Sequence, residues 1–274
     1  MSVVEPPNIL RITRSLARPG KRAELARIRA RRAQALASAK WPRPSFALTS
    51  ITGPDEAWRL TGYEAFETWN EDLETVCRMP VLGSVLELLD QEEGDLLQEN
   101  REITAVYHPE ISYRPAFDWA QMRFLDVITI QLHPGHHAEY LQNRRLVMDA
   151  HTRAELDEHI LIYTVSSGWR SGTYFILRPL KSLHDLDRIE EMHGKRYGEI
   201  LGDENRKRVI ELFAASVERE EEEYFALDTR ASHVTAAWAG SNQHDWLASA
   251  DARQSTLLDN QHQPATVRSA ALAV

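Results

Sequence analysis

The chain has 274 residues, of which 43% are hydrophobic, so it can form one large or two modest globular domains. Its formal net charge of −9 opposes general affinity for nucleic acid, because such affinity needs a positive surface that displaces counterions from phosphates. No stretch has the roughly 18 consecutive apolar residues of a membrane span, and the single cysteine, Cys77, excludes an intrachain disulfide, so we expect a soluble cytoplasmic protein without membrane contacts.

The first half of the chain predicts strands alternating with helices. Residues 8–16 alternate between apolar and other side chains, as strands do, and residues 21–37 have the period of a helix. The positive charges of this helix indicate a solvated face, with a docking patch for an acidic partner as the alternative. Cys77 is expected to be a small buried residue of a helix. The other predicted elements lie at residues 45–51, 56–64, 66–76, 81–102 and 105–115.

The second half repeats this order of elements. Its predicted strands and helices lie at residues 123–132, 136–153, 159–166, 172–180, 182–193, 204–223 and 224–234. The acidic run "EREEEEY" at residues 218–224 is interpreted as the exposed end of a long helix. Residues 236–274 have little periodicity and predict a largely disordered extension, with Trp238 and Trp246 near its start folded back on the body.

The two halves are also related in sequence. A shift of 115 residues places "LARPGKRAEL" over "LHPGHHAEY", with Pro-Gly over Pro-Gly. Ten of the 44 positions from residue 10 to residue 53 are then identical, where unrelated sequences of this composition would give roughly three. This agreement predicts a tandem repeat.

Each half therefore has the order β-α-β-β-α-β of a ferredoxin-like unit, which we place at residues 8–118 and 122–235. Such a unit covers one face of its sheet with helices, and the strands 159–166 and 172–180 are too apolar for the other face to stay in water. The two units are expected to bury these faces against each other. The predicted fold class is α+β, with the two units packed sheet to sheet as an intrachain α+β barrel.

This arrangement resembles the dimeric α+β barrel superfamily. Within it, the strand, Pro-Gly turn and helix around "LARPGKRAEL", followed by "WRLTGYEAFETW", is most similar to the NIPSNAP-like branch. The resemblance covers residues 8–235. The superfamily includes cofactor-free monooxygenases, small-molecule isomerases, haem enzymes and members of unknown role, so the resemblance implies a fold and leaves the activity open.

A cluster of three histidines, at His133, His136 and His137, suggests a metal site. Imidazole ligands must converge on one point, whereas the adjacent His136 and His137 point about 100° apart around a helix. The corresponding positions of the first half are Arg18, Lys21 and Arg22. A polar turn is therefore the better interpretation, and we predict no metal ligands here.

The candidate catalytic residues are His151 and His159. His151 lies at the end of a predicted helix and His159 opens a strand, so both could face a ligand between helix and sheet. Hydrogen-bonded histidines at the edge of the core are the structural alternative. Because their first-half counterparts are Leu36 and Pro44, any chemistry at these histidines would belong to the second half alone.

Aromatic side chains and one arginine form the candidate ligand-binding set. Tryptophan and tyrosine suit pockets for planar molecules, although they also suit a core, and an arginine can hold a carboxylate with two hydrogen bonds. The predicted ligand-binding residues are Trp58, Tyr63, Trp69, Tyr163, Tyr174 and Arg178.

Two functions remain open from the sequence. Motifs for nucleotide binding, α/β-hydrolase chemistry and zinc-protease chemistry are not found, nor are the ligand motifs of the haem branches, so we predict no cofactor. The first function is a metal-free enzyme of the oxygenase or isomerase type acting on an aromatic or carbonyl compound. The second is a non-catalytic binding or scaffolding protein. In both, the partner is a small organic ligand, and assembly into a homo-oligomer stays open.

Overall fold

The computed structural model of the protein describes residues 5–192 and 198–234. The expected C-terminal extension, including Trp238 and Trp246, lies outside the described residues. Within them the chain forms eight strands and six α-helices that make up a mixed α+β fold.

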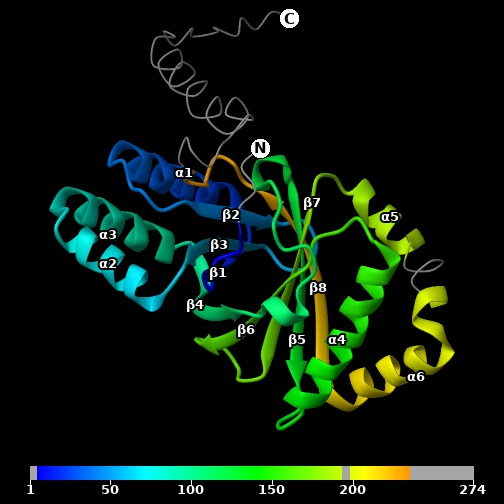
Figure 1. Ribbon diagram of the computed structural model, residues 1–274. Helices are drawn as coiled ribbons and strands as arrows, with labels where there is room; N and C mark the ends of the chain where they lie inside the picture. The colour runs from blue at the N-terminus through cyan, green and yellow to red at the C-terminus, as the bar shows by residue number, and fades with distance from the viewer. Residues whose placement is uncertain (1–4, 193–197, 235–274) are drawn as a thin grey trace, which may run out of the picture.

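All eight strands join in one closed antiparallel barrel (Figure 1), in the order β1-β3-β2-β8-β5-β7-β6-β4. The first four strands are neighbours in the order β4-β1-β3-β2, and the last four in the order β8-β5-β7-β6. Pairing of β2 with β8 and of β4 with β6 closes the barrel. The strands are β1 (Ile9–Ala17), β2 (Ser45–Ser50), β3 (Glu56–Tyr63), β4 (Leu97–Tyr107), β5 (Phe124–Leu132), β6 (Leu161–Ser167), β7 (Thr173–Leu180) and β8 (Val217–Leu227).

The helices cover the outside of the barrel in two groups. In Figure 1, α1, α2 and α3 lie on one side of the barrel and α4, α5 and α6 on the other. Glycine at position 202, with a φ of 71°, interrupts the regular conformation of α6. The helices are α1 (Arg22–Ser38), α2 (Phe66–Cys77), α3 (Pro80–Gly94), α4 (His137–Ala154), α5 (His184–Met192) and α6 (Gly198–Ser216).

The barrel interior is a packed core. Successive residues of a strand face opposite sides, and the inward positions of β1, β3 and β7 include Ile12, Trp58 and Phe175. Trp58 packs against the rings of Phe175 and Phe225, with centroids 5.5 and 5.2 Å away. The expected burial of the two helix-free sheet faces against each other is therefore achieved inside a closed barrel, in which none of the eight described strands has a free edge.

The two charged segments expected to continue helices form strands. Residues 97–102, predicted as the end of a helix, belong to β4, and the acidic run at 218–224 belongs to β8. Glutamate favours helices locally, but β4 and β8 pair along β1 and β5, and these ladders outweigh the local preference. Cys77, expected to be buried, is exposed near the end of α2.

The basic helix keeps a solvated face, which includes the exposed Arg27 and Gln34. Three arginines of α1 form ion pairs with carboxylates of α3, which joins the two helices. The pairs are Arg29 with Glu93, Arg31 with Glu92 and Arg32 with Asp90. Separately, none of the helices in residues 5–192 and 198–234 has the length and apolar character needed to cross a bilayer.

Candidate functional site

The outer face of the barrel, beneath the helices, is filled differently in the two halves. In the second half this face carries large side chains that pack against Tyr140, Val147 and Met148 of α4. They are Ile128, Ile130, Leu132, Ile162, Tyr174 and Ile176. The equivalent positions of the first half, which have the same partners in the strand pairing, carry smaller or more polar residues. Taken in the same order as the list above, they are Thr13, Ser15, Ala17, Ala47, Ala57 and Arg59. Smaller and more polar side chains therefore leave space beneath α1 and α3.

One cavity of about 680 Å³ lies between α1, the strands β2 and β3 and the segment that follows β8. We name it the alanine cavity because seven alanines line it, namely Ala17, Ala23, Ala26, Ala47, Ala57, Ala226 and Ala231. Its polar groups include Arg22, which bonds Asp55 at 3.0 Å and the Ser50 carbonyl at 2.6 Å. A mostly apolar wall with a few placed polar groups is the usual form of a small-molecule site.

A second cavity, of about 690 Å³, lies between the outer face of β1, β3 and β4 and the helices α2 and α3. We name it the arginine cavity because Arg11, Arg32 and Arg59 line it. Leu73, Val76, Leu86 and Leu97 supply its apolar wall. The cavity therefore places charged groups of both signs beside an apolar surface.

A buried ion-pair network stands between the two cavities. Arg29 lines the alanine cavity and donates from Nε to Glu93 Oε1 at 2.8 Å, while Glu93 itself lines the arginine cavity. Arg32 bonds the other oxygen of Glu93 at 3.4 Å. Burial acts to raise the pKa of Glu93, but Arg29, Arg32 and Arg59 together bring that pKa below its ordinary value. The ionised network fixes α1 against α3 and sets the inner wall of each cavity.

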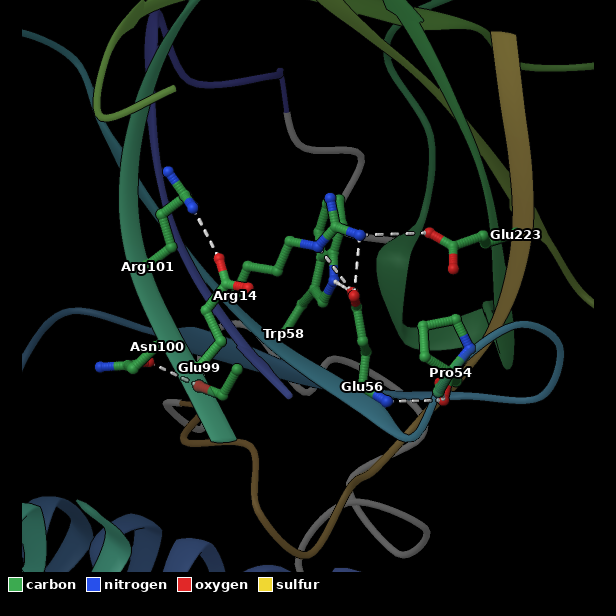
Figure 2. A network of polar contacts seen from close by, with 10 residues as sticks. Arg14, Pro54, Glu56, Trp58, Glu99, Asn100, Arg101 and Glu223 are labelled. Carbon is green, nitrogen blue, oxygen red and sulfur yellow. Dashed lines mark hydrogen bonds and ion pairs between the residues drawn. The ribbon is translucent and has the colours of Figure 1, made fainter. Parts of the chain in front are cut away.

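One mouth of the barrel is closed by a polar network (Figure 2). Arg14 donates two hydrogen bonds of 2.7 Å to Glu56, which also accepts from the Trp58 indole at 2.8 Å. The guanidinium carbon of Arg14 lies 5.3 Å from the Trp58 ring and 5.1 Å from the Trp169 ring. Glu223 lies 3.8 Å from Arg14, and burial, followed by the charge of Glu56, raises the pKa of Glu223. Because these side chains pack against one another over the core, the network closes the barrel.

The two predicted catalytic histidines lie apart from both cavities. His151 is buried on α4, where its Nδ1 lies 2.7 Å from the Val147 carbonyl and its Nε2 lies 3.0 Å from Glu158. His159 is partly exposed, with its Nδ1 2.6 Å from the Arg114 carbonyl. Neither residue lines the alanine or the arginine cavity, so their catalytic role stays a prediction.

The predicted aromatic residues fall into three places. Trp58 and Tyr163 belong to the barrel core, and the Tyr163 hydroxyl donates to the Pro7 carbonyl at 3.1 Å. Tyr63 stacks on Trp69 of α2, with ring centroids 5.5 Å apart. Tyr174 belongs to the core beneath α4. The six predicted ligand-binding residues do not line either cavity, and their role in binding also stays a prediction.

Arg178, predicted to hold a ligand carboxylate, is occupied by carboxylates of the protein. It pairs with the fully buried Asp126 and with Glu222, the latter at 2.7 Å. Burial is the main cause that raises the pKa of Asp126 to about 7, while Arg178 acts in the opposite direction.

The three clustered histidines point to different neighbours. His137 Nδ1 lies 3.1 Å from the Tyr174 hydroxyl, whereas the His136 ring packs edge-on to His133 with centroids 6.1 Å apart. Among the described residues, no group of three His, Cys, Asp or Glu side chains is arranged to hold a metal ion.

Sequence reasoning missed the residues that make the cavities. Arg59, Ala47 and Ala57 correspond in the strand pairing to Ile176, Ile162 and Tyr174 of the second half. The available signal was this loss of volume at alternate strand positions, which predicts space beneath a helix.

Comparisons with known proteins support the fold alone. No family model matches the sequence, and no curated protein is found to be similar to it. A "Putative monooxygenase" from Fusobacterium nucleatum subsp. nucleatum has a similar structure, with a TM-score of 0.54, 9% identity and coverage of 83% of this chain and 94% of that chain. An "anthrone oxidase-like protein" has a TM-score of 0.51, 11% identity and coverage of 82% and 94%. A further "putative monooxygenase", from Lactobacillus acidophilus NCFM, has a TM-score of 0.51 and 9% identity, and the match covers 82% of this chain and 95% of that chain. The chain thus shares the α+β barrel fold of these proteins, as the resemblance to the dimeric α+β barrel superfamily implied.

Proposed function

We propose that this protein binds a small aromatic or carbonyl compound in the alanine cavity. The observation that carries the proposal is the cavity of about 680 Å³ at a place where the second half of the barrel carries large side chains. A flat ligand would bury apolar surface against the alanines, and the polar groups at Arg22, Asp55 and Thr49 would orient its oxygen. Binding of this kind requires no metal and no cofactor.

The test is to fill the cavity with the residue that the second half uses. Ala47 corresponds to Ile162, so Ala47→Ile adds a side chain that the strand accepts elsewhere in the barrel. With anthrone as the probe, we expect the wild type to bind and Ala47→Ile to weaken binding by at least about tenfold, or roughly 1.4 kcal/mol. Ala37→Ile, at an exposed position of α1, is the matched control and should bind as the wild type does. Equal affinities of the wild type and Ala47→Ile, or no binding of anthrone by the wild type, would contradict the proposal.

A second candidate is a metal-free enzyme of the oxygenase or isomerase type. It is supported by the names of two kinds of structural neighbour, monooxygenase and anthrone oxidase-like protein. His151 and His159 remain its proposed acid–base groups. Anthrone and dioxygen would give anthraquinone and water, so dioxygen consumption together with anthraquinone absorbance would report turnover. Turnover that survives His151→Gln and His159→Gln would remove both histidines from the mechanism.

We also propose that the two halves are copies of one ferredoxin-like unit, with bounds at 8–118 and 122–235. Support comes from matching irregularities, because the pairing register shifts after Leu16 in β1 and after Gln131 in β5, which are 115 residues apart. Gly20 and Gly135, and likewise Gly53 and Gly168, have positive φ values at the same spacing. We further propose kinship with the NIPSNAP-like branch, homo-oligomer formation and a cytoplasmic location. A non-catalytic binding or scaffolding role is the alternative to the enzyme.

A further inference from the structure

Arg59 occupies an unusual place in the arginine cavity. It lies in the middle of β3, between Trp58 and Leu60, whose side chains belong to the barrel core. Because alternate residues of a strand face opposite sides, Arg59 is directed outward, where it lines the cavity beneath α2 and α3. The equivalent position of the second half is Ile176, so the barrel itself does not require an arginine here.

The charge of Arg59 is not neutralised by an ion pair. Its Nη2 donates to Thr13 Oγ1 at 3.1 Å, and within residues 5–192 and 198–234 no carboxylate lies at ion-pairing distance from it. The other arginines of the cavity are paired, Arg11 with Glu102 at 2.9 Å and Arg32 with Asp90. Burial, followed by the charge of Arg32, lowers the pKa of Arg59 to about 10, whereas Glu93 and Glu102 act to raise it. Binding of an anion therefore stabilises the unpaired guanidinium of Arg59 more than it stabilises a guanidinium that already has a carboxylate partner.

From this geometry we infer that Arg59 binds the carboxylate of a small monocarboxylic acid whose apolar body lies in the arginine cavity. The planar guanidinium presents paired N–H donors that match a carboxylate. Thr13 adds a hydroxyl beside it, since this hydroxyl accepts from Arg59 and retains its own hydrogen for an acceptor on the ligand. Leu73, Val76 and Leu86 offer the surface for the apolar body.

The charges around the cavity select against other anions. Five carboxylates line it alongside the three arginines, namely Glu87, Asp90, Glu93, Glu99 and Glu102. Three arginines and five carboxylates give this lining a formal net charge of −2, so a dianion such as phosphate is repelled about twice as strongly as a singly charged acid, which needs only the charge of Arg59 as its partner. A neutral ligand would leave the charge of Arg59 without a partner. The predicted order of affinity is therefore apolar monocarboxylate first, then its neutral amide, and phosphate last.

The probes are 2-naphthoate, its neutral amide 2-naphthamide, and inorganic phosphate, titrated calorimetrically into the full-length protein at pH 7.5. We expect 2-naphthoate to bind at least about tenfold more tightly than 2-naphthamide, because both partners of its hydrogen bonds to Arg59 are charged, and we expect phosphate not to bind, because the lining is net negative. Arg59→Met should weaken binding of 2-naphthoate by at least about tenfold and leave binding of 2-naphthamide unchanged. Arg153→Met removes the same charge from an exposed position of α4, away from the cavity, and should bind 2-naphthoate as the wild type does.

A stability measurement separates loss of binding from loss of folding. Arg59→Met removes an unpaired charge from beneath the helices, so its midpoint of thermal unfolding should equal or exceed that of the wild type. Ala23→Ile, which takes up volume in the alanine cavity from α1, should leave 2-naphthoate binding intact, so binding in the two cavities can be lost independently. Three results would overturn the inference: 2-naphthoate is not bound by the wild type, it is bound no better than 2-naphthamide, or it is bound equally by Arg59→Met.

Discussion

Arg14 shows how a charged residue can belong to the interior of this barrel. Its aliphatic stem lies above the core, its guanidinium is held by both oxygens of Glu56, and the rings of Trp58 and Trp169 flank it. The sequence placed Trp58 on a strand and left open whether it was core or ligand-binding. The charged partners of Arg14 lie far apart in the chain, since Glu223 belongs to β8. No local sequence pattern could therefore predict that these side chains meet.

Asp126 is the residue at which stability should depend most on pH. Burial raises its pKa to about 7, so the folded protein binds a proton that the unfolded chain has released above about pH 4. The contribution of Asp126 to the free energy of unfolding is therefore largest below about pH 4 and is lost as the pH rises towards 7. Asp126→Asn should remove that dependence.

The measurement is the free energy of unfolding by urea at pH 5, 6, 7 and 8. Relative to Asp126→Asn, the wild type should lose up to about 1.4 kcal/mol per pH unit below pH 7 and no more above it. Parallel pH profiles of the two proteins would show that Asp126 is ionised throughout and would refute the prediction.

At the scale of elements, much of the fold could be predicted because it depends on alternation and helical period. The first strand, the hairpin and the first helix of each half were placed within one or two residues. The starts of β4 and β8 could not be predicted, because segments rich in glutamate favour a helix unless a neighbouring strand offers a ladder. The two cavities could not be predicted because they depend on tertiary packing, namely on which helix covers which side chains of the barrel.

Two glycines with the same backbone conformation test how closely the β6–β7 hairpin packs on β4. Gly168 has a φ of 83°, and a Cβ there would lie 1.9 Å from the Glu102 carbonyl oxygen; Gly135 has a φ of 88° with no atom within 4 Å. Gly135→Ala should cost only the strain of the left-handed conformation, about 1–2 kcal/mol. Gly168→Ala should cost clearly more, roughly 3 kcal/mol or above, because backbone must also move. Urea unfolding of both variants is the check, and equal losses of stability would mean that the hairpin can move away from β4 freely.

At the scale of the whole molecule, the closed barrel makes each half the partner of the other. Without residues 122–235, β2 and β4 would be sheet edges and the core around Trp58 would be uncovered. An isolated half is therefore expected to be unstable as a monomer.

This dependence can be measured on the separated halves. Residues 5–118 expressed alone should form a dimer or a larger assembly in size-exclusion chromatography, because a second copy can supply the missing strands and cover the core. Mixing with residues 122–234 should yield one species with the mass of both halves. A folded monomer of residues 5–118 at micromolar concentration would contradict the prediction, because it would show that one half is stable without the other.

The alanine cavity crosses the line along which the two halves meet. Its walls come from Ala47 and Thr49 of β2 in the first half and from Ala226 to Ala231 in the second. A molecule bound there contacts both halves at once and acts as a non-covalent crosslink of the barrel. By mass action, the bound molecule raises the free energy needed to open the β2–β8 pairing. At concentrations above the dissociation constant, this increase grows with the logarithm of the ratio of concentration to dissociation constant. Occupancy of the cavity therefore becomes readable as slowed hydrogen exchange along one strand pair, even for a ligand whose chemistry is unknown.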